Sequence, residues 1–124
     1  MEVLAVTPVL RIFDVAVAKS FYVDYLGCSI DWEDGDPPNS PAYLQVSRGS
    51  LVLHLSSHHG DGSPGGVVFV EVRDLRGLLA ELRTKGYGFM NPGLDPGPGE
   101  HNVSTELIDP FSNLIRLFER GVDP

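Results

Sequence analysis

The sequence predicts an α+β protein in which two βαβββ modules form a shared concave sheet. The chain repeats itself, since VLRIFDVAVAKSFYVDYLG begins at Val9 and VFVEVRDLRGLLAELRTKG begins at Val68. Each copy has a β-rich segment, an aspartate, a helical pattern and a glycine, and three short strand patterns follow it. A module of about sixty residues buries so little surface that it is only marginally stable alone. The modules, about 3–60 and about 66–120, are therefore expected to share one core in a single domain, residues 1–124.

Both helices have recognisable first and last residues. Asp14 and Asp74 precede the helical patterns, where a carboxylate can accept hydrogen bonds from the free backbone N–H groups of the first turn. Gly27 and Gly86 follow the patterns, where helices often end in a left-handed residue. Apolar residues at helical spacing predict the buried stripes. These are Val17, Phe21 and Tyr25 in the first helix and Leu75, Leu78, Leu79 and Leu82 in the second.

Short alternating runs between turn-forming residues predict the strands. The turns are Asp34–Asn39, Arg48–Gly49 and Asp109–Asn113, and residues 92–99, PGLDPGPG, form a long Gly/Pro loop. The strands expected after the first helix are Ser29–Glu33, Ala42–Ser47 and Leu51–Ser56, and those after the second are Gly88–Met90, Asn102–Ile108 and Leu114–Glu119.

Alternation along the strands assigns side chains to two faces. The core face holds Leu10, Ile12, Leu51, Leu53, Leu55, Val68, Val70, Val72, Ile115 and Leu117. The opposite face holds Thr7, Val9, Val52, His54, Ser56, Val67, Phe69, Glu71, Leu114, Arg116 and Phe118. An apolar wall with a few polar groups is typical of a small-molecule pocket, and the alternative is a face open to solvent. Glu71 and Arg116 are expected to pair with each other or with other polar groups, because an unpaired buried charge is costly.

Three of the four histidines lie in LVLHLSSHHG, residues 51–60, and histidine is the commonest transition-metal ligand. His54 falls on a strand, whereas His58 and His59 fall at its end or in the following loop. Four residues of extended chain span roughly 13 Å, but two ligands of one metal each lie about 2 Å from it. The cluster is therefore a poor metal site by itself. The alternative is one inward histidine and two solvated ones.

Composition excludes several classes of function. The formal net charge is −8, from 17 acidic and 9 basic residues, so nucleic acid is not an expected partner. A cationic small molecule would be attracted, although the same charge also serves solubility. No apolar run is long enough to span a membrane, and the N-terminus has no secretory-signal pattern. The single cysteine, Cys28, cannot form an intramolecular disulfide, which fits a cytoplasmic location.

Four segments carry a family resemblance: VLRIFDVAVAKSFYVDYLGCSIDW, LQVSRGSLVLHLSSHHGDGSPG, VEVRDLRGLLAELRTKGY and DPFSNLIRLFE. Together they extend over roughly residues 3–119. In combination they resemble the vicinal-oxygen-chelate superfamily, which has the glyoxalase/bleomycin-resistance fold, and look most like its bleomycin-resistance proteins. The resemblance implies paired βαβββ modules and a homodimer with sites between subunits. A monomer would also expose Phe69 and Phe118.

The same resemblance bears on metal binding. Metalloenzymes of the superfamily place ligands at four strand positions, which here hold Thr7, His54, Val67 and Arg116. Only His54 can ligate well, because Val67 has no donor atom and Arg116 is a permanent cation. Zinc catalysis needs about three protein ligands. No metal or other cofactor is therefore expected, and His54 is expected to form hydrogen bonds in the pocket.

One departure from the family concerns an aromatic residue that can help to hold the drug. Bleomycin-resistance relatives often carry a Trp-Gly pair just before the seventh strand, where this chain has PGEHN, residues 98–102. Trp32, flanked by acidic residues, can offer a surface to a flat cation, or it can pack in the core. Glu100 and His101 can form an acid–base pair or be solvated. The expected ligand-binding residues are Trp32, His54, Phe69, Glu71, Glu100, His101, Arg116 and Phe118.

Two functions follow from this resemblance. The favoured one is a metal-independent antibiotic-binding protein, similar to the bleomycin-resistance proteins, that sequesters a cationic drug or metabolite in a dimer cleft without catalytic residues. The alternative is a metal-dependent enzyme, namely a glyoxalase or other lyase, a dioxygenase or a thiol transferase, acting on a small metabolite. The residues at the presumed ligand positions favour the binding protein.

Overall fold

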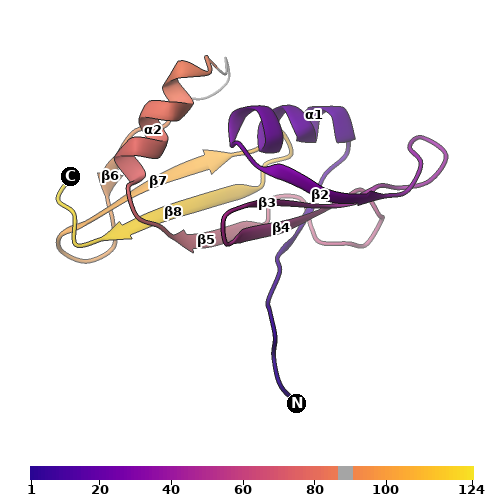
Figure 1. Ribbon diagram of the computed structural model, residues 1–124, viewed down its shortest axis with the longest axis horizontal. Helices are drawn as coiled ribbons and strands as arrows, with labels where there is room; N and C mark the ends of the chain where they lie inside the picture. The colour runs from indigo at the N-terminus through magenta and orange to yellow at the C-terminus, as the bar shows by residue number, and fades with distance from the viewer. Residues whose placement is uncertain (87–90) are drawn as a thin grey trace. The chain divides into compact units, whose positions relative to one another are not determined.

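The chain forms two compact units with the same order of elements. The structure, a computed structural model, describes residues 1–86 and 91–124. Unit 1 comprises Met1–Gly66 with Pro110–Asn113, and unit 2 comprises Val67–Asp109 with Leu114–Pro124. In each unit a strand and a helical segment precede three further strands (Figure 1). This confirms the predicted α+β class with two βαβββ modules, each with its own four-stranded mixed sheet. The prediction of a single domain stays a prediction.

The sheet of unit 1 has the strand order β1-β4-β3-β2. β1 runs parallel to β4, and the other neighbours are antiparallel. The helical segment lies over this sheet (Figure 1). The three strands expected after the helix are confirmed, with ends that differ by no more than one residue. The elements are β1 (Val9–Arg11), α1 (Val15–Lys19), η1 (Ser20–Tyr25), β2 (Ser29–Asp34), β3 (Tyr43–Arg48) and β4 (Leu51–Ser56).

The first helix begins as predicted but buries a different stripe. The Asp14 carboxylate accepts a hydrogen bond from the backbone N–H of Val17 at 3.0 Å, and Gly27 has the predicted positive φ of 81°. The α-helix continues as the π-helix η1. Val17 is 39% exposed, so its assignment to the stripe is wrong. The buried positions at i, i+3, i+4 and i+7 begin one residue later, and they are Ala18, Phe21, Tyr22 and Tyr25.

The core face of the unit 1 sheet follows the predicted alternation. Leu53 and Leu55 on β4 are fully buried, while His54 between them is half-buried on the opposite face. Leu51 is only half-buried, because it begins the strand. Ser56 lies on the opposite face and is nevertheless buried, and its hydroxyl is satisfied by donating to Asp61 Oδ2 at 2.8 Å.

The sheet of unit 2 has the order β5-β8-β7-β6, with β5 parallel to β8. The Asp74 carboxylate accepts a hydrogen bond from the Gly77 N–H at 3.1 Å, which confirms the predicted N-cap. Leu75, Leu79 and Leu82 are buried, whereas Leu78 is half-buried at the edge of the stripe. The elements are β5 (Val67–Glu71), α2 (Leu75–Thr84), β6 (Asp95–Pro96), β7 (Asn102–Ile108) and β8 (Leu114–Arg120).

The second strand of unit 2, the first after its helix, differs from the prediction. The expected strand Gly88–Met90 lies outside the described residues. Instead, the predicted Gly/Pro loop contains the short strand β6, in which Asp95 pairs with Ser104 and Pro96 with Val103. Pro96 is tolerated there because β6 is an edge strand, where no neighbour requires its missing N–H. Among the described residues, no helix has the length and apolar character needed to cross a membrane.

Candidate functional site

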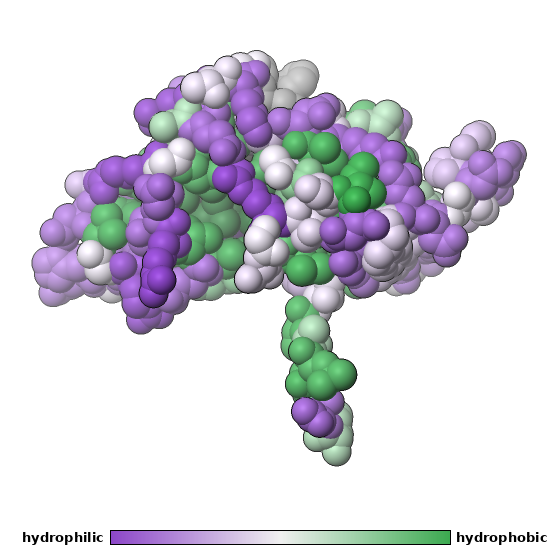
Figure 2. All heavy atoms as spheres, viewed as in Figure 1, coloured by the Kyte–Doolittle hydropathy of each residue, from purple (hydrophilic) through white to green (hydrophobic). Residues whose placement is uncertain are grey.

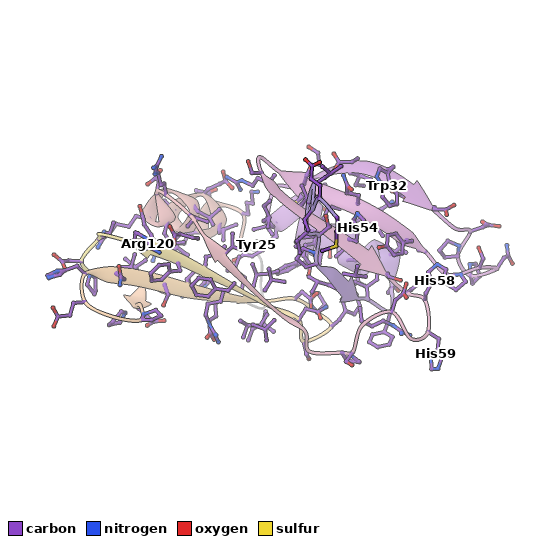
Figure 3. The ribbon with its side chains drawn as sticks, turned by 90° about the horizontal axis from the view of Figure 1, so that it is seen from below. Tyr25, Trp32, His54, His58, His59 and Arg120 are labelled. Atoms are coloured by element: carbon purple, nitrogen blue, oxygen red, sulfur yellow. The ribbon has the colours of Figure 1, made fainter. Side chains whose placement is uncertain are left out.

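An aromatic cluster lies on the face of the unit 1 sheet that is opposite to the core. The rings of Trp32 and Tyr43 stack with centroids 5.8 Å apart and planes inclined by 6°. His54 meets both rings edge-on, at 5.2 Å from Trp32 and 5.1 Å from Tyr43. The ring centroid of His58 lies 6.3 Å from that of Tyr43, and both His58 and His59 are exposed after the end of β4 (Figure 3). Trp32 is 43% exposed, so it is not a core residue.

A chain of hydrogen bonds crosses the same face. The Tyr43 hydroxyl lies 2.7 Å from His54 Nδ1, and His54 Nε2 lies 2.9 Å from Gln45 Oε1. Gln45 Nε2 donates to Asp31 Oδ2 at 3.0 Å. The Ser47 hydroxyl donates to the other oxygen of the same carboxylate, also at 3.0 Å. Both ring nitrogens of His54 are therefore engaged by neighbouring side chains.

A β-bulge allows Asp31 and Trp32 to act on the same face. The register between β2 and β3 shifts here, so that Ile30 opposes Val46 while Trp32 opposes Gln45. On a regular strand consecutive side chains point to opposite faces, but an extra residue breaks that alternation. Asp31 consequently reaches Gln45 while the adjacent Trp32 ring stays within the aromatic cluster.

The Tyr43 phenol keeps its proton at neutral pH. Burial raises the pKa of this hydroxyl above its ordinary value of 10.0, and the negative charge of Asp61 raises it further. A neutral phenol can donate one hydrogen bond and accept others. The Tyr43 hydroxyl is therefore able to act as a donor to His54.

In unit 2, two ion pairs flank the face opposite to the core. Arg116 donates to Glu106 Oε1 from Nη2 at 2.9 Å and from Nε at 3.2 Å. Arg120 forms a two-pronged pair with Glu71, at 2.6 Å and 3.1 Å. The hydrogen bond from Arg120 holds the pKa of the Glu71 carboxyl below its usual value, and the positive charge of Arg120 adds to this effect. Glu71 and Arg116 are thus each paired, but not with each other.

Between these ion pairs lie two phenylalanines whose ring centroids are 5.4 Å apart. Phe69 is 55% exposed, as expected, but Phe118 is only 6% exposed, so its predicted exposure is wrong. The loop before β7 covers Phe118, since a Cβ added at Gly97 would lie 3.1 Å from its Cε2. The Arg120 guanidinium also lies 5.8 Å from the Phe118 ring centroid.

Glu100 and His101 are exposed in the turn before β7 and do not form an acid–base pair with each other. His101 Nδ1 lies 2.6 Å from Asp123 Oδ1, with both side chains more than two-thirds exposed. In the described part of the chain, no hydrogen bond, ion pair or ring contact joins Glu100 or His101 to the other residues of the expected site. Their predicted role in binding therefore has no support from the geometry of unit 2.

The residues at the presumed metal-ligand positions do not fit a metal ion. Coordination by His54 would require one of its ring nitrogens to leave its present hydrogen bond. Val67 has no donor atom, and the guanidinium of Arg116 pairs with a carboxylate. In the described ranges 1–86 and 91–124, no group of three or more His, Cys, Asp or Glu side chains is arranged to hold a metal.

Unit 1 also has a separate hollow between the start of α1 and the loop before β3. It is lined by residues 13–16, residues 37–41 and Ser57. None of the expected ligand-binding residues lies in this lining, so the hollow is distinct from the aromatic face.

The chain belongs to the glyoxalase superfamily, because the model of that family matches residues 2–123. This family membership agrees with the observed architecture of two units with β-α-β-β-β order. No curated protein matches the chain.

Solved structures extend this likeness to the whole fold. A bleomycin-binding protein in complex with bleomycin is 22% identical with a TM-score of 0.69, over 94% of this chain and 98% of that chain. The antibiotic-binding protein TnmS3 from Streptomyces sp. CB03234 is 19% identical with a TM-score of 0.70, over 97% and 98%. A glyoxalase/bleomycin resistance protein/dioxygenase from Alicyclobacillus acidocaldarius is 18% identical with a TM-score of 0.66, over 94% and 92%. At these identities, the similarity shows the fold alone.

The structure brings together several residues that the sequence-based prediction did not include. Tyr43 and Gln45 share the face of His54, and alternation along AYLQVS with Leu44 and Val46 could have identified them. Asp31 could not have been found in this way, because the bulge between Ile30 and Trp32 leaves no signature in the composition. Arg120 and Glu106 were missed because long charged side chains can pair across strands in many combinations.

Proposed function

We propose that this protein binds a cationic drug of the bleomycin type, or a similar cationic small molecule, without chemical conversion. The observation that carries the proposal is the stacked pair of Trp32 and Tyr43 beside the Asp31 carboxylate on one sheet face. A planar cation gains from an aromatic surface and from a nearby negative charge. Two structural relatives that bind antibiotics, one of them in complex with bleomycin, add support.

The charge of the chain favours the same ligand class. Asp34, two residues after Trp32, is exposed on β2, and the whole chain has a net charge of −8. Such a surface attracts cations over a distance set by the Debye length, which is about 8 Å at physiological ionic strength. The affinity for a cationic drug is therefore expected to fall as salt is added.

We also propose that the chain is a homodimer, because apolar surface stays uncovered in each unit. In unit 2, β5 is an edge strand on which Val67 and Phe69 are 59% and 55% exposed. In unit 1, the N-terminal segment extends away from β1 (Figure 1), and Figure 2 shows it as largely apolar. Val3, Leu4 and Val6 in this segment are 64%, 87% and 86% exposed.

Exposed apolar edges of this kind promote association. A second copy that covers these edges would prevent non-specific aggregation and would provide a cleft between subunits for the drug. The proposed action is sequestration in the cytoplasm, where the bound drug no longer reaches its target.

The test compares bleomycin binding to the native protein and to two alanine variants. Trp32→Ala should weaken binding by about 10- to 100-fold, because it removes stacking and cation–π attraction. Phe13→Ala is the matched control, since Phe13 is a similarly exposed aromatic of unit 1 that lines the separate hollow. Trp32 is the only tryptophan, so its fluorescence reports whether the ligand reaches β2.

A cellular experiment tests the biological side of the proposal. Expression of the protein in a sensitive bacterium should raise its tolerance to bleomycin, and expression of Trp32→Ala should raise it less. Equal tolerance with and without the native protein would contradict sequestration as the function.

A further inference from the structure

We propose that Asp31 is a positioning residue, which sets the direction of the hydrogen-bond chain through Gln45 and His54 so that the site selects ligands with N–H donors. This inference deepens the proposed function and rests on it for the identity of the ligand. The relevant observation is the continuous chain Tyr43–His54–Gln45–Asp31, with heavy-atom distances of 2.7, 2.9 and 3.0 Å.

The direction of the chain follows from its last member. A carboxylate can only accept hydrogen bonds, so Asp31 requires the NH₂ group of Gln45 to point toward it. The Gln45 carbonyl then faces His54 Nε2, which must carry the proton in order to donate. In the neutral ring, Nδ1 is consequently an acceptor, and the Tyr43 hydroxyl donates to it.

This direction determines what the face offers to a ligand. The Tyr43 hydroxyl has donated its only hydrogen to His54, so its remaining lone pairs can only accept. The Asp31 oxygens are acceptors as well. Both ring nitrogens of His54 are already engaged, because Nε2 donates to Gln45 and Nδ1 accepts from Tyr43. Beside the exposed ring of Trp32, the available groups therefore suit a flat cation whose N–H groups donate, such as an amidinium or a protonated amine on an aromatic ring.

The isosteric change Asp31→Asn tests the positioning role. An asparagine can donate as well as accept, so the chain can then run in either direction and His54 is free to take both tautomers. In buffer basic enough for histidines to be neutral, ¹⁵N NMR of the ring should show protonated Nε2 and unprotonated Nδ1 for His54 in the native protein. Asp31→Asn should add a population with protonated Nδ1.

Ser47→Ala is the matched control for the tautomer experiment. It removes the other hydrogen bond of Asp31 but leaves the carboxylate and its bond to Gln45 in place. The His54 signals should therefore keep the native tautomer. A native His54 protonated at Nδ1, or a tautomer that Asp31→Asn leaves unchanged, would overturn the proposal.

The selectivity for donors is tested with two small probes of the same shape. Benzamidine is a flat cation with N–H donors, and benzoate is a flat anion with acceptors only. The native protein should bind benzamidine more tightly than benzoate. Tyr43→Phe should weaken benzamidine binding by about tenfold, which corresponds to one hydrogen bond to a charged group, while Ser47→Ala should not.

The outcomes separate this inference from the proposed function. Equal binding of the two probes, or an unchanged benzamidine affinity in Tyr43→Phe, would refute the selection of donors. Benzamidine binding with the expected loss in Tyr43→Phe, together with no binding of bleomycin, would support the selection of donors and reject only the proposal that the ligand is a bleomycin-type drug.

Discussion

Replacement of Glu119 by glutamine should destabilise the protein by removing a charged cap from α2. One oxygen of this β8 carboxylate accepts a hydrogen bond from the backbone N–H of Asp74, and the other accepts one from Leu75, each at 2.9 Å. These N–H groups belong to the first turn of α2 and its N-cap, where a negative charge is favourable. Glutamine keeps one acceptor oxygen but loses the second acceptor and the charge.

The free energy of unfolding should fall by about 1 kcal/mol at neutral pH, which is typical for the removal of a helix cap. This estimate takes the low end for charged hydrogen bonds, because Glu119 is partly exposed and solvent screens its charge. For a chain of this size, the corresponding decrease in Tm is about 3–5 °C.

The effect should depend on pH in a defined direction. The hydrogen bond from Leu75, followed by that from Asp74, lowers the pKa of the Glu119 carboxyl in the folded protein below its ordinary value of 4.5. A carboxyl with a lowered folded pKa stabilises the protein above the unfolded pKa, and this stabilisation disappears as pH falls through the folded pKa. The difference in free energy of unfolding between the native protein and Glu119→Gln should therefore shrink below pH 4.5.

Urea denaturation followed by far-ultraviolet circular dichroism, at a series of pH values, measures this difference. Glu106→Gln serves as the control, since it also neutralises a carboxylate of unit 2, but one in an exposed ion pair with Arg116 that contributes little. The capping role would be refuted if the native protein and Glu119→Gln had the same free energy of unfolding at neutral pH, or if their difference persisted unchanged in acid.

Three further predictions concern metal, assembly and the core. The purified protein should contain no stoichiometric transition metal, and elemental analysis that finds about one metal per chain, lost in His54→Ala, would overturn this. Sedimentation at micromolar concentration should give a dimer, which Phe69→Glu should weaken, whereas a native monomer would count against the proposed assembly. Leu55→Ala should lower the free energy of unfolding by about 2–5 kcal/mol, because Leu55 is fully buried; a loss well under 1 kcal/mol in urea denaturation would show that its site repacks.

The sequence was sufficient to predict the fold class and all strands except β6, because its local signals agree with each other. Asp14 and Asp74 cap the helices as predicted, since an N-cap depends only on the residue and the turn that follows it. The alternation of Leu53, His54 and Leu55 correctly separates the two faces of β4. Such signals involve neighbours in the chain, which a sequence displays directly.

The candidate site was less predictable because it depends on register and on choices among partners. The bulge in β2 aligns Asp31 and Trp32 on one face, and only the pairing with β3 reveals it. Glu71 is paired with Arg120 and not with Arg116, although both arginines lie on β8 and on the same face. Burial of Phe118 depends on the close approach of a distant glycine loop. None of these contacts follows from periodicity.

A calorimetric titration with bleomycin, on a sample whose metal content is measured, tests the central claim most directly. The proposed function predicts saturable binding without added metal, no conversion of the drug, and an affinity that falls with salt. The absence of binding to any bleomycin-family compound, together with turnover of a small metabolite on addition of a divalent metal, would contradict the claim and establish a metal-dependent enzyme instead.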